Sequence, residues 1–160
     1  MPIPEEAMPV AANPLSLDNQ LCFAVYAAGH AFNRVYRPLL KDLGLTYPQY
    51  LVMLVLWQDR QASVGEIGDR LGLDSGTLSP LLKRLEKIGL IRRNRNPDDE
   101  RMVLIQLTAQ GVAAEENARQ VAAGIARAVG CSLDEMVRLK RDIDALADRL
   151  DASIALAAAS

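Results

Sequence analysis

The chain has 160 residues, of which half are hydrophobic and about a quarter are charged. This size and composition are typical of a globular domain with a hydrophobic core. Its longest purely apolar stretch, residues 51–57, is far shorter than the ~20 residues needed to cross a bilayer, which excludes a membrane-spanning protein. The net charge of −2 argues against a surface that coats a polyanion as a whole.

Residues 1–15 contain prolines and acidic residues but no lysine or arginine, so they lack the basic start of a secretory signal. We therefore expect a disordered tail on a cytoplasmic protein. Two cysteines, Cys22 and Cys131, are too few for a disulfide framework and should be reduced at rest. The sequence has neither the cysteine and histidine spacing of a metal site nor a phosphate-binding glycine loop, so we expect no metal and no cofactor.

The first half of the chain predicts two long helices. The first begins near Ser16 or Asp18, both good N-caps, and Pro38 should kink it or end its first part near Leu40. The second follows Pro48, which suits the start of a helix. Because this second helix is apolar on nearly every side, we expect it to be buried.

Residues 63–88 have the plan of a helix-turn-helix. Ser63 and Glu66 fit a capping box, and Asp74 is a good N-cap for a second helix that should end at Gly89. Pro80 removes one helical hydrogen bond, so an irregular first turn is expected. A glycine-containing turn joins the two helices. The predicted buried stripe of the second helix is Leu78, Leu81, Leu82, Leu85 and Ile88.

The segments on either side of "NPDDE" predict two strands joined as a hairpin. Thr108 should cap a helix that runs to about Val129, and "SLDE" at 132–135 predicts a capping box for a last helix. The fold class is thus mainly α with a small β-hairpin wing: a winged helix over about 48–108, within one domain over 16–160. Dimerisation helices are expected over about 16–45 and 108–156. Side chains of the last helix expected to point inward are Met136, Leu139, Ile143, Leu146 and Leu150.

The stretch from Lys83 to Arg95 holds six basic residues and one acidic residue, Glu86, which indicates a focused contact with nucleic acid. A solvated charged face, or a winged helix used for protein contacts, is the alternative. In a DNA complex the second helix would meet base edges or phosphates in the major groove, and the hairpin would place Arg95 and Arg101 toward the minor groove. The residues expected on DNA from the second helix are Ser75, Thr77, Ser79, Pro80, Lys83 and Arg84.

The segment "GEIGDRLGLDSGTLSPLLKRLEKIGLIRRNRNPDDERMVLIQLTAQG" resembles the core of the MarR family of winged-helix regulators, with the "DDER…LT..G" wing signature. "LCFAVYAAGHAFNRVYRPLLKDLGLTYPQYLVMLVLW" resembles the organic-hydroperoxide-sensing, OhrR-type branch. The resemblance implies a reactive Cys22 whose thiolate accepts hydrogen bonds from Tyr36 and Tyr47. It also implies that Asp99 holds the wing arginine, Arg101. Cys131 resembles the second thiol of the two-cysteine members, which would form a disulfide with Cys22.

Without the resemblance, the residues leave the roles of both cysteines open. Cys22 is either inert packing on an apolar helix face or a thiol activated by the amides of the first helical turns. Cys131 is either that second thiol or the outer member of a hydrophobic staple with Met136. His30 lies eight residues after Cys22, a rise of about 12 Å, which excludes a direct dyad and favours a structural histidine.

The predicted function is a homodimeric repressor, not an enzyme, that binds double-stranded operator DNA. Organic hydroperoxide would oxidise Cys22, a disulfide with Cys131 would follow, and the operator would be released. The nearest alternative is a MarR-type repressor that responds to a phenolic ligand, with Cys22 inert. A thiol peroxidase and a helical module for protein contacts are further alternatives.

Overall fold

The computed structural model describes residues 13–159, so most of the predicted tail, residues 1–15, lies outside the described residues. Two compact units are present, Met1–Val121 and Ala122–Ser160, and the boundary falls inside helix α5. A single domain over 16–160 stays a prediction.

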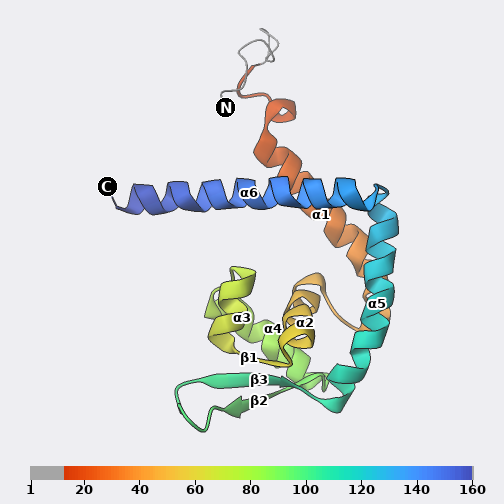
Figure 1. Cartoon of the computed structure of the whole chain (residues 1–160), viewed down its shortest axis with the longest axis vertical. Coiled ribbons are helices and arrows are strands. Elements are labelled where there is room, and N and C mark those ends of the chain that lie inside the picture. The colour runs from red at the N-terminus through yellow and green to blue at the C-terminus, as the bar shows by residue number, and fades with distance from the viewer. Residues whose placement is uncertain (1–12, 160) are drawn as a thin grey trace. The chain divides into compact units, whose positions relative to one another are not determined.

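The elements, shown in Figure 1, are α1 (Leu21–Leu39), α2 (Tyr47–Asp59), β1 (Gln61–Ser63), α3 (Val64–Leu71), α4 (Ser75–Lys87), β2 (Ile91–Arg95), β3 (Val103–Leu107), α5 (Ala109–Val129) and α6 (Leu133–Ala158), with short 3-10 helices at Leu17–Asn19 and Lys41–Leu43.

Helix α1 begins later than the sequence predicts. Ser16 precedes the 3-10 helix Leu17–Asn19 instead, and Gln20 occupies the N-cap position of α1. The predicted start at Ser16 or Asp18 is therefore wrong, because the residues that follow Ser16 form this short 3-10 helix before α1 begins. As predicted, α1 ends just after Pro38. Within residues 13–159, no helix has both the length and the apolarity to cross a bilayer.

The helix-turn-helix forms as predicted. The Ser63 hydroxyl accepts the Glu66 amide and the Glu66 carboxylate accepts the Ser63 amide, which completes the capping box. Gly72 adopts φ +64° between the two helices, a conformation that favours glycine. Helix α4 continues through Pro80 without interruption, so the predicted irregular first turn is wrong.

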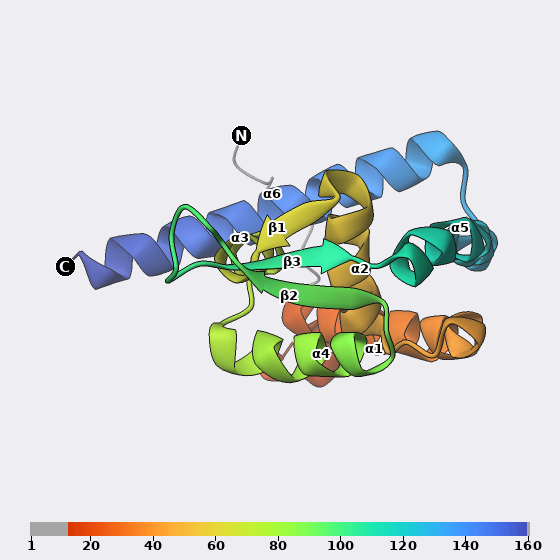
Figure 2. The same ribbon diagram turned by 90° about the horizontal axis from the view of Figure 1, so that it is seen from below.

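The sheet has three strands rather than the predicted two. Strand β3 lies between β1 and β2 and is antiparallel to both, as Figure 2 shows. Gln61 pairs with Gln106, and Arg92 pairs with Gln106 on the other side. Strand β1 spans only three residues, too few to show the alternation that identifies a strand in sequence.

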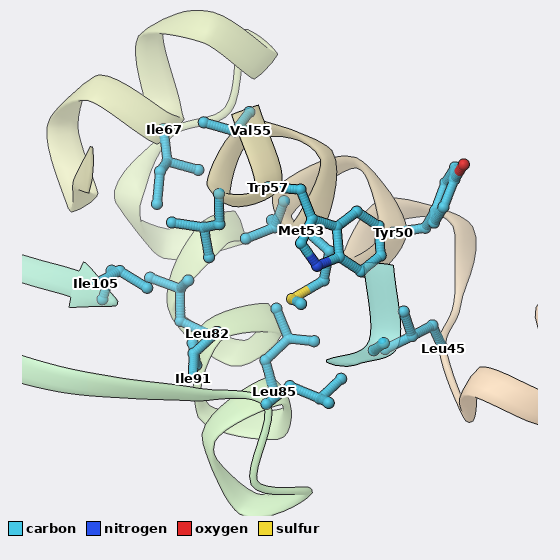
Figure 3. Close-up of a cluster of buried hydrophobic side chains, with 14 of the residues drawn as sticks. Leu45, Tyr50, Met53, Val55, Trp57, Ile67, Leu82, Leu85, Ile91 and Ile105 are labelled. Carbon is cyan, nitrogen blue, oxygen red and sulfur yellow. The ribbon is translucent and has the colours of Figure 1, made fainter. Parts of the chain in front are cut away.

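The core of the first unit lies between α2, α4 and the inner face of the sheet (Figure 3). Helix α2 is buried on most sides, as its apolar sequence predicts, and Thr46 and Gln49 form its capping box. Below, the winged-helix region denotes residues 47–107, from α2 to β3. The largest fully buried side chains of the unit are Leu40, Met53, Leu56, Ile67, Leu78, Leu82, Leu85, Ile91, Ile105 and Val52.

Helix α6 dominates the second unit. Ser132 and Glu135 form the predicted capping box at its start. Its apolar stripe does not point into a core: Leu139 and Leu150 are 55% and 57% exposed, and Met136 is half-buried. The inward orientation predicted for this stripe is therefore wrong for the single chain. The helix carries an apolar stripe for which the described chain provides no core.

Candidate functional site

Helix α4 presents one face to solvent and buries the other. Leu78, Leu82 and Leu85 pack into the core. This fixes the rotation of the helix and leaves a polar face free for a ligand. The predicted DNA-binding residues on that face are exposed, apart from a half-buried Ser79: Ser75, Thr77, Ser79, Pro80, Lys83 and Arg84.

Asp74 organises the start of α4. Its carboxylate accepts the Thr77 amide at 2.8 Å and the Thr77 hydroxyl at 3.2 Å. These hydrogen bonds to the charged form lower the pKa of Asp74. The Thr77 hydroxyl thus donates to Asp74 and can still accept a hydrogen bond from an outside partner. The Ser75 hydroxyl makes no hydrogen bond within the described residues. Sequence reasoning treated the two hydroxyls alike.

The wing between β2 and β3 carries Arg95 and Arg101, both exposed. The Asp99 side chain accepts the backbone N–H of Arg101 at 3.0 Å, and its carbonyl accepts the Met102 amide at 2.9 Å. In the part of the chain that the structure describes, the Arg101 guanidinium forms no ion pair. Asp99 therefore shapes the turn that presents Arg101 and leaves the guanidinium available to an anion.

The basic residues between Lys83 and Arg95 fall into two groups, those with a hydrogen-bond or ion-pair partner in the fold and those without one among the described residues. Arg93 forms an ion pair with Glu86 at 3.0 Å, which ties β2 to α4. The Arg92 guanidinium donates to Gln106 on β3. Of the six basic side chains, these two are engaged within the fold, so the other four carry the charge offered to a polyanion: Lys83, Arg84, Lys87 and Arg95.

Cys22 is the second residue of α1 and is exposed in the single chain. The unpaired amides of a first helical turn place a partial positive charge at this end of the helix. Its neighbours Leu21, Phe23 and Val25 are apolar and exposed as well. The sequence predicts Cys22 within the first turn and a half of its helix. Because α1 begins later than predicted, Cys22 lies closer to the N-terminal end of that helix.

Tyr36 and Tyr47 lie together, as their shared predicted role requires. Their rings stack with centroids 4.2 Å apart, and Tyr50 packs beside Tyr36 at 5.6 Å. Burial raises the pKa of Tyr36 to about 12, with the neighbouring Tyr47 and Tyr50 adding to the effect. Burial also raises the pKa of Tyr47. Both phenols therefore keep their protons at neutral pH and can act as hydrogen-bond donors.

Tyr36 and Tyr47 are too far from Cys22 of their own chain to donate hydrogen bonds to it. Cys22 and Tyr36 stand fourteen residues apart on the continuous helix α1, a rise of about 21 Å. The predicted hydrogen bonds to Cys22 therefore require the tyrosine pair of a second chain.

Tyr26, the phenol one helical turn from Cys22, was not among the predicted site residues. Its i, i+4 spacing puts it on the same face of α1, a signal that the sequence contains. The Tyr26 ring packs against His30 at 4.3 Å and against Phe23 at 6.3 Å. His30 is exposed in the single chain, so its role as a packed structural histidine is confined to this ring contact.

Cys131 precedes the Ser132 cap of α6 and follows Gly130, which adopts φ +68°. Cys131 and Met136 are both half-buried, as expected of the two members of a hydrophobic staple. The thiol is also partly accessible, so both predicted roles are compatible with its position. Cys131 belongs to the second unit and Cys22 to the first.

A capped helix-turn-helix, an exposed polar face on its second helix and a basic wing define a winged-helix DNA-binding protein. A family profile described as transcriptional regulator SarA/Rot matches residues 34–117. The chain is 52% identical to the HTH-type transcriptional regulator TtmR of Methylorubrum extorquens over 88% of its length and 72% of that protein. It is 43% identical to the organic hydroperoxide resistance transcriptional regulator of Bacillus subtilis over 85% of its length and 92% of that protein.

Solved structures of AbfR from Staphylococcus epidermidis are also similar. Reduced AbfR bound to DNA matches with a TM-score of 0.76 and 37% identity over 86% of this chain and 94% of that one. Disulfide-formed AbfR matches with a TM-score of 0.60 and 38% identity over 81% and 91%. The chain belongs to the SarA/Rot and MarR family of winged-helix transcriptional regulators, and its work is to bind DNA and regulate transcription.

Proposed function

We propose that the protein is a homodimeric repressor that senses organic hydroperoxides through Cys22. The observation that carries the proposal is the position of this thiol: exposed, in the first turn of α1, with apolar neighbours. The similarity to a Bacillus regulator of organic hydroperoxide resistance supports it. An apolar surround favours an alkyl or lipid hydroperoxide over hydrogen peroxide, because it accommodates the organic group.

The dimer is needed to complete the sensing site. The exposed apolar stripes of α1 and α6 provide a surface for a second chain. The Tyr36–Tyr47 pair of that second chain would then donate hydrogen bonds to the Cys22 thiolate. Two winged-helix regions in such a dimer would meet successive major grooves about 34 Å apart, with α4 in the groove and Arg95 and Arg101 at the minor groove.

The chemical step begins when the Cys22 thiolate attacks one peroxide oxygen. A sulfur–oxygen bond forms, the O–O bond breaks, and the organic part leaves as an alcohol after taking a proton, which gives a sulfenic acid. The Cys131 thiol then attacks the sulfenic sulfur, forming a disulfide and releasing water. The closure pulls two backbone segments to within the ~7 Å that a disulfide allows between Cα atoms. A hundredfold loss of operator affinity requires only ~2.7 kcal/mol of coupling, less than many disulfides supply.

Mobility-shift assays test the sensor role, with a DNA duplex selected from a random pool by the reduced protein. Cumene hydroperoxide should release wild type from this duplex, and dithiothreitol should restore binding. Cys22→Ser should stay bound, and its release by the peroxide would refute the proposal. If a phenolic compound releases wild type and cumene hydroperoxide does not, the protein is a ligand-responsive repressor instead.

A separate experiment tests Cys131. After peroxide treatment, wild type should lose two free thiols, whereas Cys131→Ser should stop at the sulfenic acid, which dimedone labels. Cys131→Ser that still forms a disulfide would exclude Cys131 as the second thiol. Cys131→Ala with unchanged disulfide chemistry and lower thermal stability would assign the residue to the staple.

A further inference from the structure

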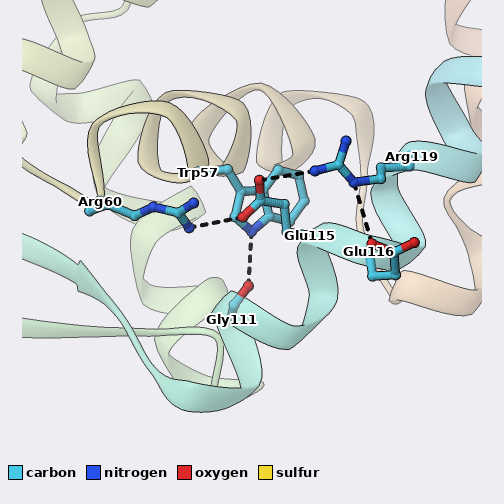
Figure 4. A network of polar contacts seen from close by, with 6 residues as sticks. All are labelled: Trp57, Arg60, Gly111, Glu115, Glu116 and Arg119. Atoms are coloured by element: carbon cyan, nitrogen blue, oxygen red, sulfur yellow. Dashed lines mark hydrogen bonds and ion pairs between the residues drawn. The ribbon is translucent and has the colours of Figure 1, made fainter.

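The first turns of α5 are fastened to the winged-helix region by contacts that the DNA-binding and sensing roles do not use. The Trp57 indole N–H donates to the Gly111 carbonyl at 2.8 Å, and the Arg60 guanidinium donates to the Glu115 carboxylate at 2.8 Å, as Figure 4 shows. Gly111 also lies so close to Leu90 that an added Cβ would stand 2.0 Å from the Leu90 carbonyl oxygen. The start of α5 therefore has little freedom to move against α2 and β2.

Arg60 has an unusual backbone conformation for its residue type. At φ +64° and ψ −31°, it is the one non-glycine residue between 13 and 159 with a positive φ. This region favours glycine, and Arg60 occupies it as the C-cap of α2, where its backbone N–H donates to the Leu56 carbonyl. The Arg60 side chain is 59% exposed, and exposed ion pairs contribute little to the free energy of unfolding.

Helix α5 begins in the first unit and ends in the second, as one continuous helix from Ala109 to Val129. A helix transmits a displacement along its length only if its ends are held. Trp57 and Arg60 hold the first end, since both belong to α2 or its C-cap. These contacts make the start of α5 and the winged-helix region one body.

We propose that Arg60 is a coupling residue: through Glu115 on α5 it makes a change in the second unit, Ala122–Ser160, move the DNA-binding region. This rests on the proposed function, in which oxidation acts on that unit through Cys131. The ion pair adds a second polar link between α2 and α5, beside the Trp57–Gly111 hydrogen bond.

The Arg119 side chain provides a matched control. It approaches Glu115 at 4.0 Å and Glu116 at 3.3 Å, so all its ion pairs lie within α5. Arg119→Gln removes a charge from the same carboxylate cluster (Figure 4) and leaves the link between α5 and α2 in place.

Arg60→Gly separates coupling from stability, because glycine accepts the backbone conformation that arginine strains. We expect a melting temperature equal to or above that of wild type, and reduced-state operator affinity within threefold of it. Cys22 should be oxidised by cumene hydroperoxide at the wild-type rate. Operator release should nevertheless fall about fivefold, the most that an exposed ion pair worth ~1 kcal/mol can supply, whereas Arg119→Gln should be released like wild type. Arg60→Gly that is oxidised and released as wild type would overturn the coupling role and leave the sensor intact.

Glu115→Gln tests the same link from its other side and should reproduce the loss of release. The double variant Arg60→Glu/Glu115→Arg rebuilds the ion pair with its charges exchanged and should recover at least half of the wild-type release. If Glu115→Gln and the double variant both fold and are oxidised at Cys22, but the double variant recovers no release, the ion-pair mechanism is contradicted. A wild type that is oxidised at Cys22 without releasing DNA would instead contradict the proposed function, and the coupling role with it.

Discussion

The winged-helix region and helix α6 use the same helical periodicity with opposite results. Met53 and Leu82 in the winged-helix region are almost fully buried, whereas Leu139 and Leu150 on α6 are more than half exposed. Both sets recur at the spacing that places apolar side chains on one face of a helix. The difference lies in what each apolar face packs against. In the winged-helix region it packs against a sheet and neighbouring helices of the same chain, whereas no residue of α6 is buried in the described chain.

Helix α1 follows the pattern of α6. None of its described side chains is buried, and Leu21, Phe23 and Tyr26 are exposed around the thiol. Cys22 therefore sits on a surface that a second chain would convert into a pocket. The winged-helix region thus folds around its own core, whereas the apolar faces of α1 and α6 would be buried in the proposed dimer.

The largest effect should come from damage to the self-sufficient core. Leu82→Ala removes a side chain that is 1% exposed and should lower the free energy of unfolding by about 2–5 kcal/mol, through lost burial and a residual cavity. Leu54→Ala, on the exposed side of α2 at 41%, is the control and should cost well under half as much. Urea titration followed by circular dichroism measures both. Equal losses would mean that the core is not where the structure places it.

An effect of the next size should appear on α6, as weaker association. Leu150→Glu places a charge in the apolar stripe and should raise the dimer dissociation constant at least tenfold, or about 1.4 kcal/mol. Ala152→Glu introduces the same side chain two residues later, on the opposite side of the helix, and should leave association unchanged. Sedimentation equilibrium compares them. A Leu150→Glu protein that associates like wild type would remove α6 from the interface.

A smaller effect should follow removal of a helix cap in the winged-helix region. Ser63→Ala deletes the hydroxyl that accepts the Glu66 amide and should cost about 1 kcal/mol, with operator affinity reduced because α3 supports α4. Ser63→Thr keeps a capping hydroxyl and should retain most of the stability. Thermal melts decide: an alanine variant as stable as wild type would show that the capping box is not needed.

The smallest effect should be seen at alkaline pH. The folded state raises the pKa of Tyr36 to about 12, so between pH 10 and 12 the unfolded chain releases a proton that the folded chain retains. Stability is therefore present below pH 10 and declines as the pH rises toward 12. Tyr36→Phe removes this titration and should make the decline shallower in denaturant titrations at pH 9 and 11. An identical slope for both proteins would contradict the burial of this phenol.

Much of the first unit could be predicted because its signals are local. Ser63 with Glu66, Asp74 and Gly72 mark helix ends within a few residues, and apolar spacing identifies the buried faces. Strand β1 escaped prediction since it is too short for periodicity and exists through its pairing with β3. The predicted start of α1 was too early because Leu17–Asn19 form a separate 3-10 helix, which periodicity does not distinguish from a first α-helical turn.

The candidate site was predicted as a set of residues, whereas its geometry required the fold. The sequence identified Cys22, Tyr36 and Tyr47, but only the continuous helix α1 shows that the thiol and the tyrosines of one chain cannot meet. It also identified Asp99 and Arg101, but the structure shows that Asp99 holds the backbone of the turn.

By itself the sequence determined the helix-turn-helix, the basic wing and the thiol near a helix start, because caps, turns and amphipathic spacing act over a few residues. Tertiary structure alone decided the stacking of Tyr36 on Tyr47 and the link from Arg60 to Glu115. Such contacts join segments far apart in the chain, and their geometry follows from how the core packs. The apolar faces of α1 and α6 stay exposed in the described chain.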